Sequence, residues 1–185
     1  MSTSNIAFTW PETFNCSLVK DSSIYPNQYS ISISMIAKVI DDEAIRLGFR
    51  KLKHFINHYI KNSILIKHDS PLLISLDSIE TNTIQLPEDP HDFIFALILF
   101  HKFSAILEDI ITITQITIDS SIGDRVKYTV NTGKQNLNGD HWWNTNSPGT
   151  NDIDVFPTWN DVIIYNPRFE PKVVLGGKNE DRSTR

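Results

Sequence analysis

The chain is poor in cysteine, in basic charge and in long hydrophobic runs. Its single cysteine, Cys16, excludes an intrachain disulfide. The longest apolar run, 93–100, is too short to span a bilayer. With 17 Lys and Arg against 22 Asp and Glu, the net charge of −5 argues against a nucleic-acid-binding surface. The first five residues are polar and uncharged, unlike a secretory leader, so we expect an intracellular, cytoplasmic protein that binds neither nucleic acid nor a membrane.

Alanine is scarce as well, because the 185 residues include 5 alanines against 26 isoleucines. Such a bias is typical of a low-GC genome, for example that of a virus or phage, and a viral protein would act in the host cytoplasm or in the virion. Other proportions are ordinary: 40% hydrophobic and 21% charged residues suit a globular domain that buries a sizeable core.

The stretch 29–53 organises the chain. In its first part, 29–40, apolar residues alternate with serines, which predicts a strand with one apolar and one hydroxyl-rich face. The acidic run 41–43 interrupts this strand. Apolar residues then recur at three- and four-residue spacing, and this period predicts an amphipathic helix over about 48–64.

A second helix is expected over 93–107, which is apolar nearly all round. Asp89 can cap this helix, Pro90 suits the first helical position and Asp92 adds negative charge to the first turn. A helix of this composition is buried on more than one side, so we expect it between a sheet and a neighbouring element.

Several further segments have strand character. Within 110–118 the apolar positions change from odd to even numbers, which predicts a β-bulge near Thr114-Gln115. Ser22, Ser23 and Pro26 predict a loop over 21–27. The remaining strands are expected over 6–10, 14–19, 83–86 and 125–130.

The main elements therefore follow the order β-β-α-α-β-β. We predict an α+β fold in which an antiparallel sheet carries two helices on one face. This domain covers residues 1–130. The remainder, 131–185, is expected to be a loop-rich, aromatic C-terminal extension with a polar tail, because Gly, Asn and Thr are frequent there.

Six segments carry a resemblance to a known family. Residues 8–14 (Phe-Thr-Trp-Pro-Glu-Thr-Phe) begin the first strand, and 25–29 (Tyr-Pro-Asn-Gln-Tyr) lead into the alternating strand. Segments 45–53, 66–72, 90–93 and 116–120 follow in order. In the order and spacing of these segments along the chain, the first domain resembles the 6-pyruvoyl-tetrahydropterin synthase and 6-carboxy-tetrahydropterin synthase family, which has the tunnelling fold.

The resemblance implies a homo-oligomer, because protomers of that fold pair their sheet edges into a closed barrel. It also implies three zinc-binding histidines, but those positions hold Phe14, Tyr25 and Asn27, which are not plausible zinc ligands. The family's catalytic cysteine falls near Asp21. Cys16 is out of register with it, and a small buried apolar thiol is the competing interpretation. We therefore expect neither a metal nor a cofactor.

Two residues keep chemistry that the resemblance assigns to the site. His68 matches a family histidine and is the candidate catalytic acid or base, although Lys67 replaces the aspartate before it. Asp119 falls where the family uses a glutamate to hold the pterin ring, which makes it the candidate ligand-binding residue. The competing interpretation of Asp119 is a turn residue.

The other histidines are weaker candidates. His54 and His58 are four apart on the first helix and share a face, as helical metal pairs require. We favour surface histidines as the explanation. His91 and His101 lie in or beside the second helix and are expected to satisfy local partners.

The extension carries two further groups of interest. Asp140, His141, Asp152 and Asp154 form an acidic patch that could hold Ca²⁺ or Mg²⁺, although a solvated loop is the favoured interpretation. The aromatic residues are too many for a free tail, so they are expected to cover this domain's open face, a neighbouring subunit or another protein. They are Trp142, Trp143, Phe156, Trp159, Tyr165 and Phe169.

Two functions follow, and they belong to different classes. The first is a non-catalytic tunnelling-fold protein, used as an oligomeric structural, assembly or partner-binding component of possible phage origin, whose partners are itself and other proteins bound by the extension. The alternative is a zinc-independent enzyme or binder acting on a pterin or purine at subunit interfaces, with Asp119 as anchor and His68 as acid or base. A general α+β interaction domain is the third interpretation.

Overall fold

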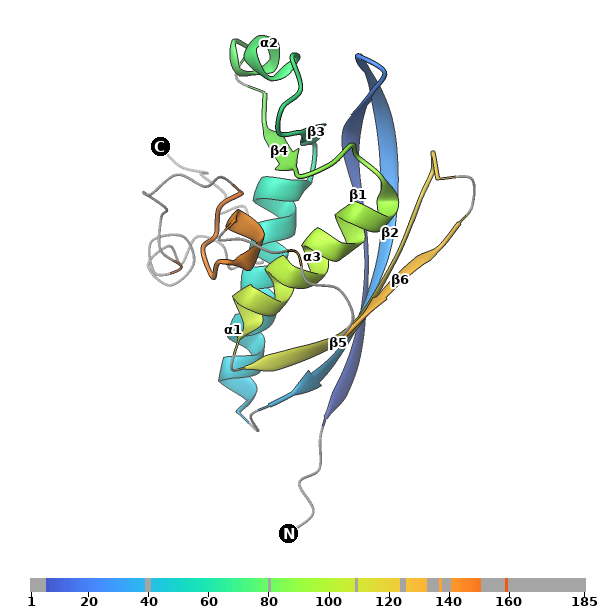
Figure 1. Cartoon of the computed structure of the whole chain (residues 1–185). Helices are drawn as coiled ribbons and strands as arrows, with labels where there is room; N and C mark the ends of the chain where they lie inside the picture. Colours follow the sequence, from blue (N-terminus) through green and yellow to red (C-terminus); the bar gives the residue numbers. More distant parts are fainter. Residues whose placement is uncertain are drawn as a thin grey trace, which may run out of the picture.

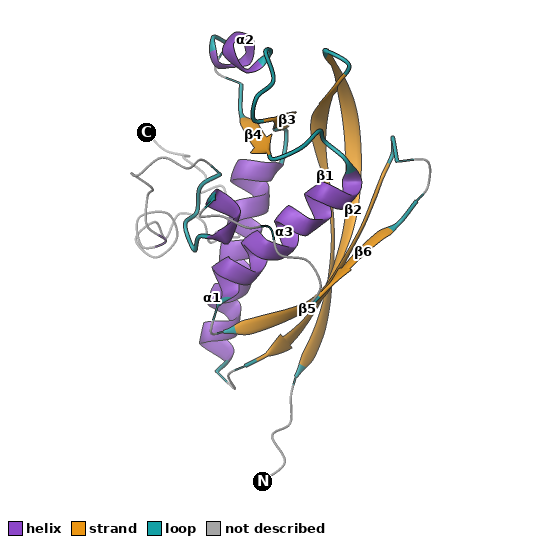
Figure 2. Ribbon diagram, in the orientation of Figure 1, coloured by secondary structure: helices purple, strands orange, loops and turns teal. Residues whose placement is uncertain are grey.

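The computed structural model describes residues 6–38, 41–79, 81–108, 110–123, 126–132, 137, 141–150 and 159. Within this part of the chain, six strands form one sheet in the order β4-β3-β1-β2-β5-β6. Helices α1 and α3 lie on the same face of that sheet (Figures 1 and 2). The α+β class and the two helices on one face are as predicted.

The first two strands form one long hairpin. β1 (Ala7–Lys20) runs antiparallel to β2 (Ser23–Ala37), and their register is unbroken from Ala7 to Lys20. Asp21 and Ser22 connect them with φ values of 49° and 59°. Positive φ at both central residues is what a two-residue hairpin turn of type I′ requires. The expected loop over 21–27 is therefore wrong, because β2 begins immediately after the turn.

The bulge predicted near Thr114-Gln115 is confirmed. β5 (Ile111–Ser120) runs antiparallel to β2, with Ser34 opposite Gln115 and Met35 opposite Ile113. Thr114 is the extra residue, so the apolar side chains on both sides of it point to the core. β6 (Tyr128–Asn131) then pairs antiparallel with β5.

The segment between the two long helices adds strands of the other direction. α1 (Asp42–Phe55) continues into a π-helical turn, η1 (Ile56–Ile60). β3 (Ile64–Lys67) then pairs parallel with β1, and β4 (Thr83–Leu86) pairs parallel with β3. The short helix α2 (Leu73–Asp77) connects them. The sheet is therefore mixed, and the predicted antiparallel pairing holds for the four strands β1, β2, β5 and β6.

Helix α3 (Asp92–Leu107) is buried on several sides, as its composition predicted. It contacts β5 and β6 on one side and the single turn η2 (Trp142–Asn144) of the extension on another. The helix begins at Asp92 after His91, so the cap expected at Asp89 is wrong. None of the described helices is long and apolar enough to cross a membrane.

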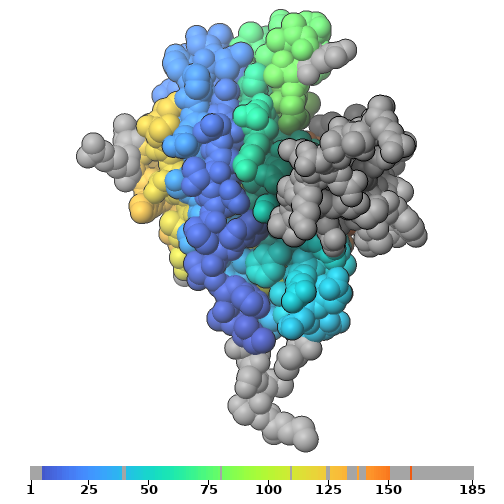
Figure 3. All heavy atoms as spheres, turned by 180° about the vertical axis from the view of Figure 1, so that it is seen from behind, coloured from blue at the N-terminus to red at the C-terminus, as the bar shows by residue number. Residues whose placement is uncertain are grey.

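The two faces of the sheet differ in chemistry. Phe14, Tyr29, Ile33 and Ile116 point to the helices and belong to the core. Figure 3 is turned to view the molecule from behind, where β1 and β2 face the reader. On the face opposite the helices, hydroxyl and amide side chains stand in register across the strands. One such row contains Ser32, Thr117 and Thr129, and another contains Thr9, Ser34, Gln115 and Asn131.

Candidate functional site

The three positions that the resemblance assigns to zinc do not form a metal site. The Phe14 ring is buried, stacks on Tyr29 at 5.8 Å and meets Phe95 edge-on at 6.2 Å. Tyr25 is 43% exposed near the tip of the hairpin. The Oδ1 atom of Asn27 already accepts hydrogen bonds from Ser121 Oγ at 2.7 Å and from a backbone N–H at 3.2 Å. A benzyl ring, an exposed phenol and an occupied amide oxygen do not fit zinc.

Cys16 does not substitute for the missing ligands. It is 2% exposed, and its thiol donates a hydrogen bond to the carbonyl oxygen of Ile60 at 3.2 Å. Burial raises the pKa of the thiol to about 12, although a hydrogen bond with Ser63 opposes the shift. Metal binding and nucleophilic attack both require the thiolate, so this residue is a small buried packing group. Among the described residues, no three His, Cys, Asp or Glu side chains converge on a possible metal position.

The structure does not bring His68 and Asp119 together within one chain. His68 follows β3, and its Nδ1 lies 3.3 Å from the carbonyl oxygen of Leu86. Asp119 lies on β5, where its carboxylate pairs with Lys127 at 3.5 Å. β1 and β2 separate these two strands, which places the residues at least roughly 14 Å apart. A joint role therefore requires two chains.

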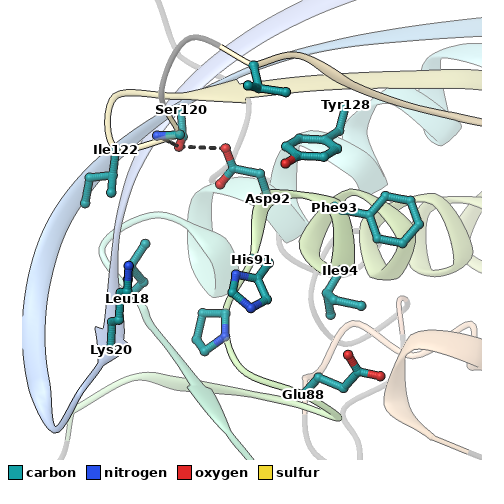
Figure 4. A pocket seen from close by; sticks show the side chains of 13 residues that line it. Leu18, Lys20, Glu88, His91, Asp92, Phe93, Ile94, Ser120, Ile122 and Tyr128 are labelled. Carbon is teal, nitrogen blue, oxygen red and sulfur yellow. Dashed lines mark hydrogen bonds between the residues drawn. The ribbon is translucent and has the colours of Figure 1, made fainter.

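A cavity of about 670 Å³ lies beside the N-terminal end of α3. Its walls come from the end of β1, the segment that leads into α3, the end of β5 with the following turn, and β6. Figure 4 shows Asp92 between Ser120 and Tyr128, with Leu18 and Ile94 further along the wall. The cavity wall is thus mixed, because Lys20, Glu88 and His91 line it beside the apolar residues, and Asp92 places a carboxylate at the start of the helix.

Asp92 is held in place by two neighbours. Its Oδ2 accepts a hydrogen bond of 2.8 Å from Ser120 Oγ, which itself accepts one of 3.1 Å from the Gly123 N–H. Asp92 as a whole residue is 8% exposed. Burial raises its pKa above the ordinary aspartate value, the bond from Ser120 opposes this shift, and the nearby Asp119 adds to it. Such a carboxylate can hold a ligand that offers N–H donors.

The sequence did not identify this cavity. The sequence indicates Asp92 only as a first-turn charge, and it gives no reason to connect Ser120 or Tyr128 with it. The available signal was one acidic residue at the start of an otherwise apolar helix, because burial of such a helix carries the carboxylate toward the core with it. Its hydrogen-bond partner Ser120 lies 28 residues away, and Tyr128, which lines the same cavity, lies further along the chain, so no local pattern indicates either residue.

The described tryptophans of the extension cover this chain's own helices. Trp142, Trp143 and Trp159 are 2%, 4% and 7% exposed and belong to the hydrophobic core. Trp142 lies 6.4 Å from Phe55 of α1, and Trp159 lies 6.1 Å from His54. Phe156, Tyr165 and Phe169 lie outside the described residues, as do Asp140, Asp152 and Asp154.

The histidines have different environments. The rings of His54 and His58 stack at 4.3 Å, but His54 is only 8% exposed, so the expectation of a surface residue is wrong there. Burial lowers the pKa of His54 to about 4, and His58 adds to the shift. His91 lines the cavity, His101 lies against Phe100 at 6.0 Å, and His141 lies against Trp143 at 4.4 Å.

Comparisons with known proteins return the family that the sequence resembles, at the level of the fold. An uncharacterised protein from Wolinella succinogenes superposes with a TM-score of 0.47 and 8% identity, covering 71% of this chain and 100% of its own. The 6-pyruvoyltetrahydropterin synthase of Plasmodium vivax superposes with a TM-score of 0.46 and 9% identity, covering 69% and 98%. A catalytic-residue mutant of that synthase gives 0.47 and 9% over the same shares.

No protein-family model matches the chain, and no curated protein matches it either. At this level of identity, the structural likeness concerns the course of the backbone and carries no information about side-chain chemistry.

Proposed function

We propose that this chain is a non-catalytic structural protein that assembles into a homo-oligomer through two open strand edges. The observation that carries the proposal is that, among the described residues, the unit β1-β2-β5-β6 has a stretch without a pairing strand at each of its two edges. One open edge is the first half of β1, residues 7–13, and the other is β6.

The β1 edge is open because β3 covers only its end. β3 pairs with Ser17 and Leu18, and the Asn62 N–H reaches the Asn15 carbonyl oxygen at 2.7 Å. Since backbone groups alternate in direction along a strand, the odd-numbered residues before Asn15 also face away from β2. Pro11 is one of them and lacks an N–H, so the edge offers donors on either side of it.

The β6 edge offers a complementary set of groups. The Thr132 N–H donates to the carbonyl oxygen of Thr114 at 3.3 Å, which fixes the residues that face β5. By alternation, Thr129 and Asn131 direct their N–H and C=O groups away from the sheet. If β6 of one copy pairs with β1 of the next, the sheet continues head to tail, and the twist of the strands allows it to close.

The chemistry of the two faces supports such closure. Because α1 and α3 occupy one face, a closed sheet would carry the helices outside and enclose the hydroxyl-rich face. Within the four strands, Asp119 is the single charged residue on that face, and Lys127 neutralises it at 3.5 Å. A sheet face exposed to solvent normally carries many Lys and Glu side chains, whereas this face does not.

A non-catalytic role is supported by what occupies the zinc positions. Phe14 is a core ring and Asn27 ties the β5–β6 turn to β2, so both side chains already have structural contacts. If the isoleucine-rich composition reflects a viral source, a virion or virus-assembly component is the concrete form of the proposal, with the extension as a further surface for other proteins.

The assembly is tested by light scattering on the purified full chain at micromolar concentration. A mass that is a multiple of 21.2 kDa is expected. Thr9→Pro and Thr129→Pro each remove an outward N–H without removing a bond within the sheet, so both should lower the mass. Gln85→Pro makes the same change on β4 and should leave the mass unchanged. A monomeric wild-type protein overturns the proposal.

The second candidate function is zinc-independent binding of a pterin or purine. The observation that favours it is the buried Asp92 carboxylate in a cavity that also has apolar walls, because such heterocycles present adjacent N–H donors and a flat apolar ring. Asp119 and His68 would contribute only from neighbouring chains, at the interfaces of an oligomer.

This candidate is tested by denaturing the purified protein and examining the supernatant for a pterin or purine by absorbance and fluorescence. A stoichiometric heterocycle favours ligand binding, and Asp92→Asn, Asp119→Ala or His68→Ala should then reduce uptake. An empty cavity in a defined oligomer, together with unchanged assembly in these variants, favours the structural role.

A further inference from the structure

The outermost strand β4 is a third strand edge, and Trp142 of the extension contacts it. β4 pairs with β3 through Ile64 N–H to Asn82 O and His68 N–H to Leu86 O, both at 2.9 Å. These bonds show that the even-numbered residues face β3. By alternation, Thr83 and Gln85 direct their backbone groups outward, where another strand could pair with them.

One of these outward groups is already taken. The indole Nε1 of Trp142 donates a hydrogen bond of 3.2 Å to the Gln85 carbonyl oxygen. The Trp142 side chain is 2% exposed, so a bulky ring lies where a pairing strand would have to approach. The contact joins residues 57 positions apart, and it depends on the extension being docked.

A buried lysine on α3 holds the covering segment. Lys102 is 0% exposed, and its Nζ donates to the carbonyl oxygen atoms of Trp142 at 2.8 Å and Thr145 at 3.0 Å. The hydroxyls of Thr145 and Ser147 both lie 3.4 Å away. The Phe55 and Trp142 rings flank the ammonium at 5.4 and 5.7 Å.

This arrangement couples the burial of a charge to the docking of residues 142–147. An ammonium group can be taken out of water only where polar atoms replace its hydration, and here the segment supplies carbonyl and hydroxyl oxygens. When the segment leaves, water can reach Lys102 and solvate it again. Release therefore leaves no buried charge without polar neighbours, so the segment can leave and return reversibly.

We infer that residues 142–147 form a removable cap on β4, and that their release opens β4 to strand pairing with a second copy of this chain. The inference rests on the proposed self-association and adds a regulated edge to it. In the capped state, assembly uses the edges of β1 and β6 alone. In the released state, β4 joins them and larger assemblies form.

The test compares the full-length wild type with Lys102→Met, which keeps a long unbranched side chain and removes the cation. Hydrogen exchange of peptides covering 142–147 should become about tenfold faster or more, and light scattering should report a larger mass. Lys53→Met, on the exposed side of α1, is the matched control and should change neither quantity.

A second substitution assigns the added mass to β4. Gln85→Pro removes an outward N–H of that strand, so adding it to Lys102→Met should return the mass to the wild-type value while the fast exchange persists. If Lys102→Met does not fold, Thr145→Val replaces it, because this change removes a hydroxyl that contacts both Lys102 and the Trp142 carbonyl.

The outcomes separate the two proposals. A monomeric wild type whose mass rises on release overturns the assembly through β1 and β6 but supports the β4 cap. An oligomeric wild type whose released variant keeps the same mass overturns the cap and leaves the first assembly standing. Unchanged protection of 142–147 in the folded Lys102→Met variant also overturns the cap.

Discussion

Gly123 leaves the space that the Asp92 carboxylate occupies. A Cβ atom added at position 123 would stand 2.3 Å from Asp92 Oδ2 and 3.0 Å from Ser120 Oγ. The turn after β5 can therefore approach the start of α3 only with a glycine at this position. This approach lets the Gly123 N–H bond Ser120, which in turn bonds Asp92.

Gly123→Ala should destabilise the protein by about 1–3 kcal/mol, because the new methyl group must push Asp92 or the turn aside. Urea unfolding measures this change. The matched control repeats the substitution in an Asp92→Ala background, where the opposing oxygen is absent. An equal loss in both backgrounds would show that the contact with Asp92 is not the cause.

Acidification should destabilise the fold through His54. The folded state holds the His54 pKa at about 4, below the ordinary value of 6.5. Between these values the unfolded state binds more protons, so stability falls as pH decreases from 6.5 to 4, by about 3 kcal/mol in total. His54→Gln should flatten this part of the curve. An equal slope in both proteins would contradict the prediction.

Asp41 should stabilise α1 more than its acidic neighbour does. Its Oδ1 accepts hydrogen bonds from the N–H groups of Glu43 at 3.0 Å and Ala44 at 3.4 Å. Asp41→Ala should cost about 1 kcal/mol in chemical unfolding, since it leaves two helix donors without this acceptor. Asp42→Ala changes the charge of the same turn and keeps the cap, so its loss should be the smaller one.

Cys16 should react only through unfolding. With a pKa raised to about 12 by burial, the folded protein contains almost no thiolate at neutral pH. Labelling by a thiol reagent should therefore proceed at least about a thousandfold more slowly in buffer than in denaturant. Urea below the unfolding midpoint should accelerate it in step with the unfolded fraction. Rapid stoichiometric labelling in buffer would contradict the burial of this thiol.

The best sequence predictions came from patterns longer than one turn or strand. The alternation over 29–37 fixed the faces of β2, and Ile31, Ile33 and Met35 do point to the core. The change of apolar positions in β5 located the bulge at Thr114, because a bulge is the device that moves alternation by one residue. Periodicity reports burial directly, so these features could be predicted.

Two prolines explain why the first hairpin was predicted as separate pieces. Pro11 faces the open edge of β1. Pro26 precedes Tyr29, which is the first β2 residue along the chain that pairs with β5. Neither position needs an N–H for pairing within the sheet, so both strands continue through proline. Whether a proline ends a strand depends on which neighbour its nitrogen faces, and the local sequence does not contain that information.

The cavity and β3 could not be predicted from the sequence for a related reason. β3 has four residues, Ile64–Lys67, buried among other elements, and so short an apolar run has no period of its own. Asp92 meets Ser120 only because α3 and β5 are packed together. Contacts between distant segments define the candidate site, whereas sequence patterns describe one segment at a time.

The turn Asp21-Ser22 sets the register of the sheet. Its length determines which residues of β1 stand opposite which residues of β2. β5 pairs with β2 and β6 pairs with β5, so the alignment of these strands with β1 depends on the same turn. A single inserted residue there would shift the register between β1 and β2 by one residue. Either the serines of β2 would turn inward and its isoleucines outward, or a new bulge would have to absorb the difference. The chemical identity of both faces thus depends on the length of a two-residue connection.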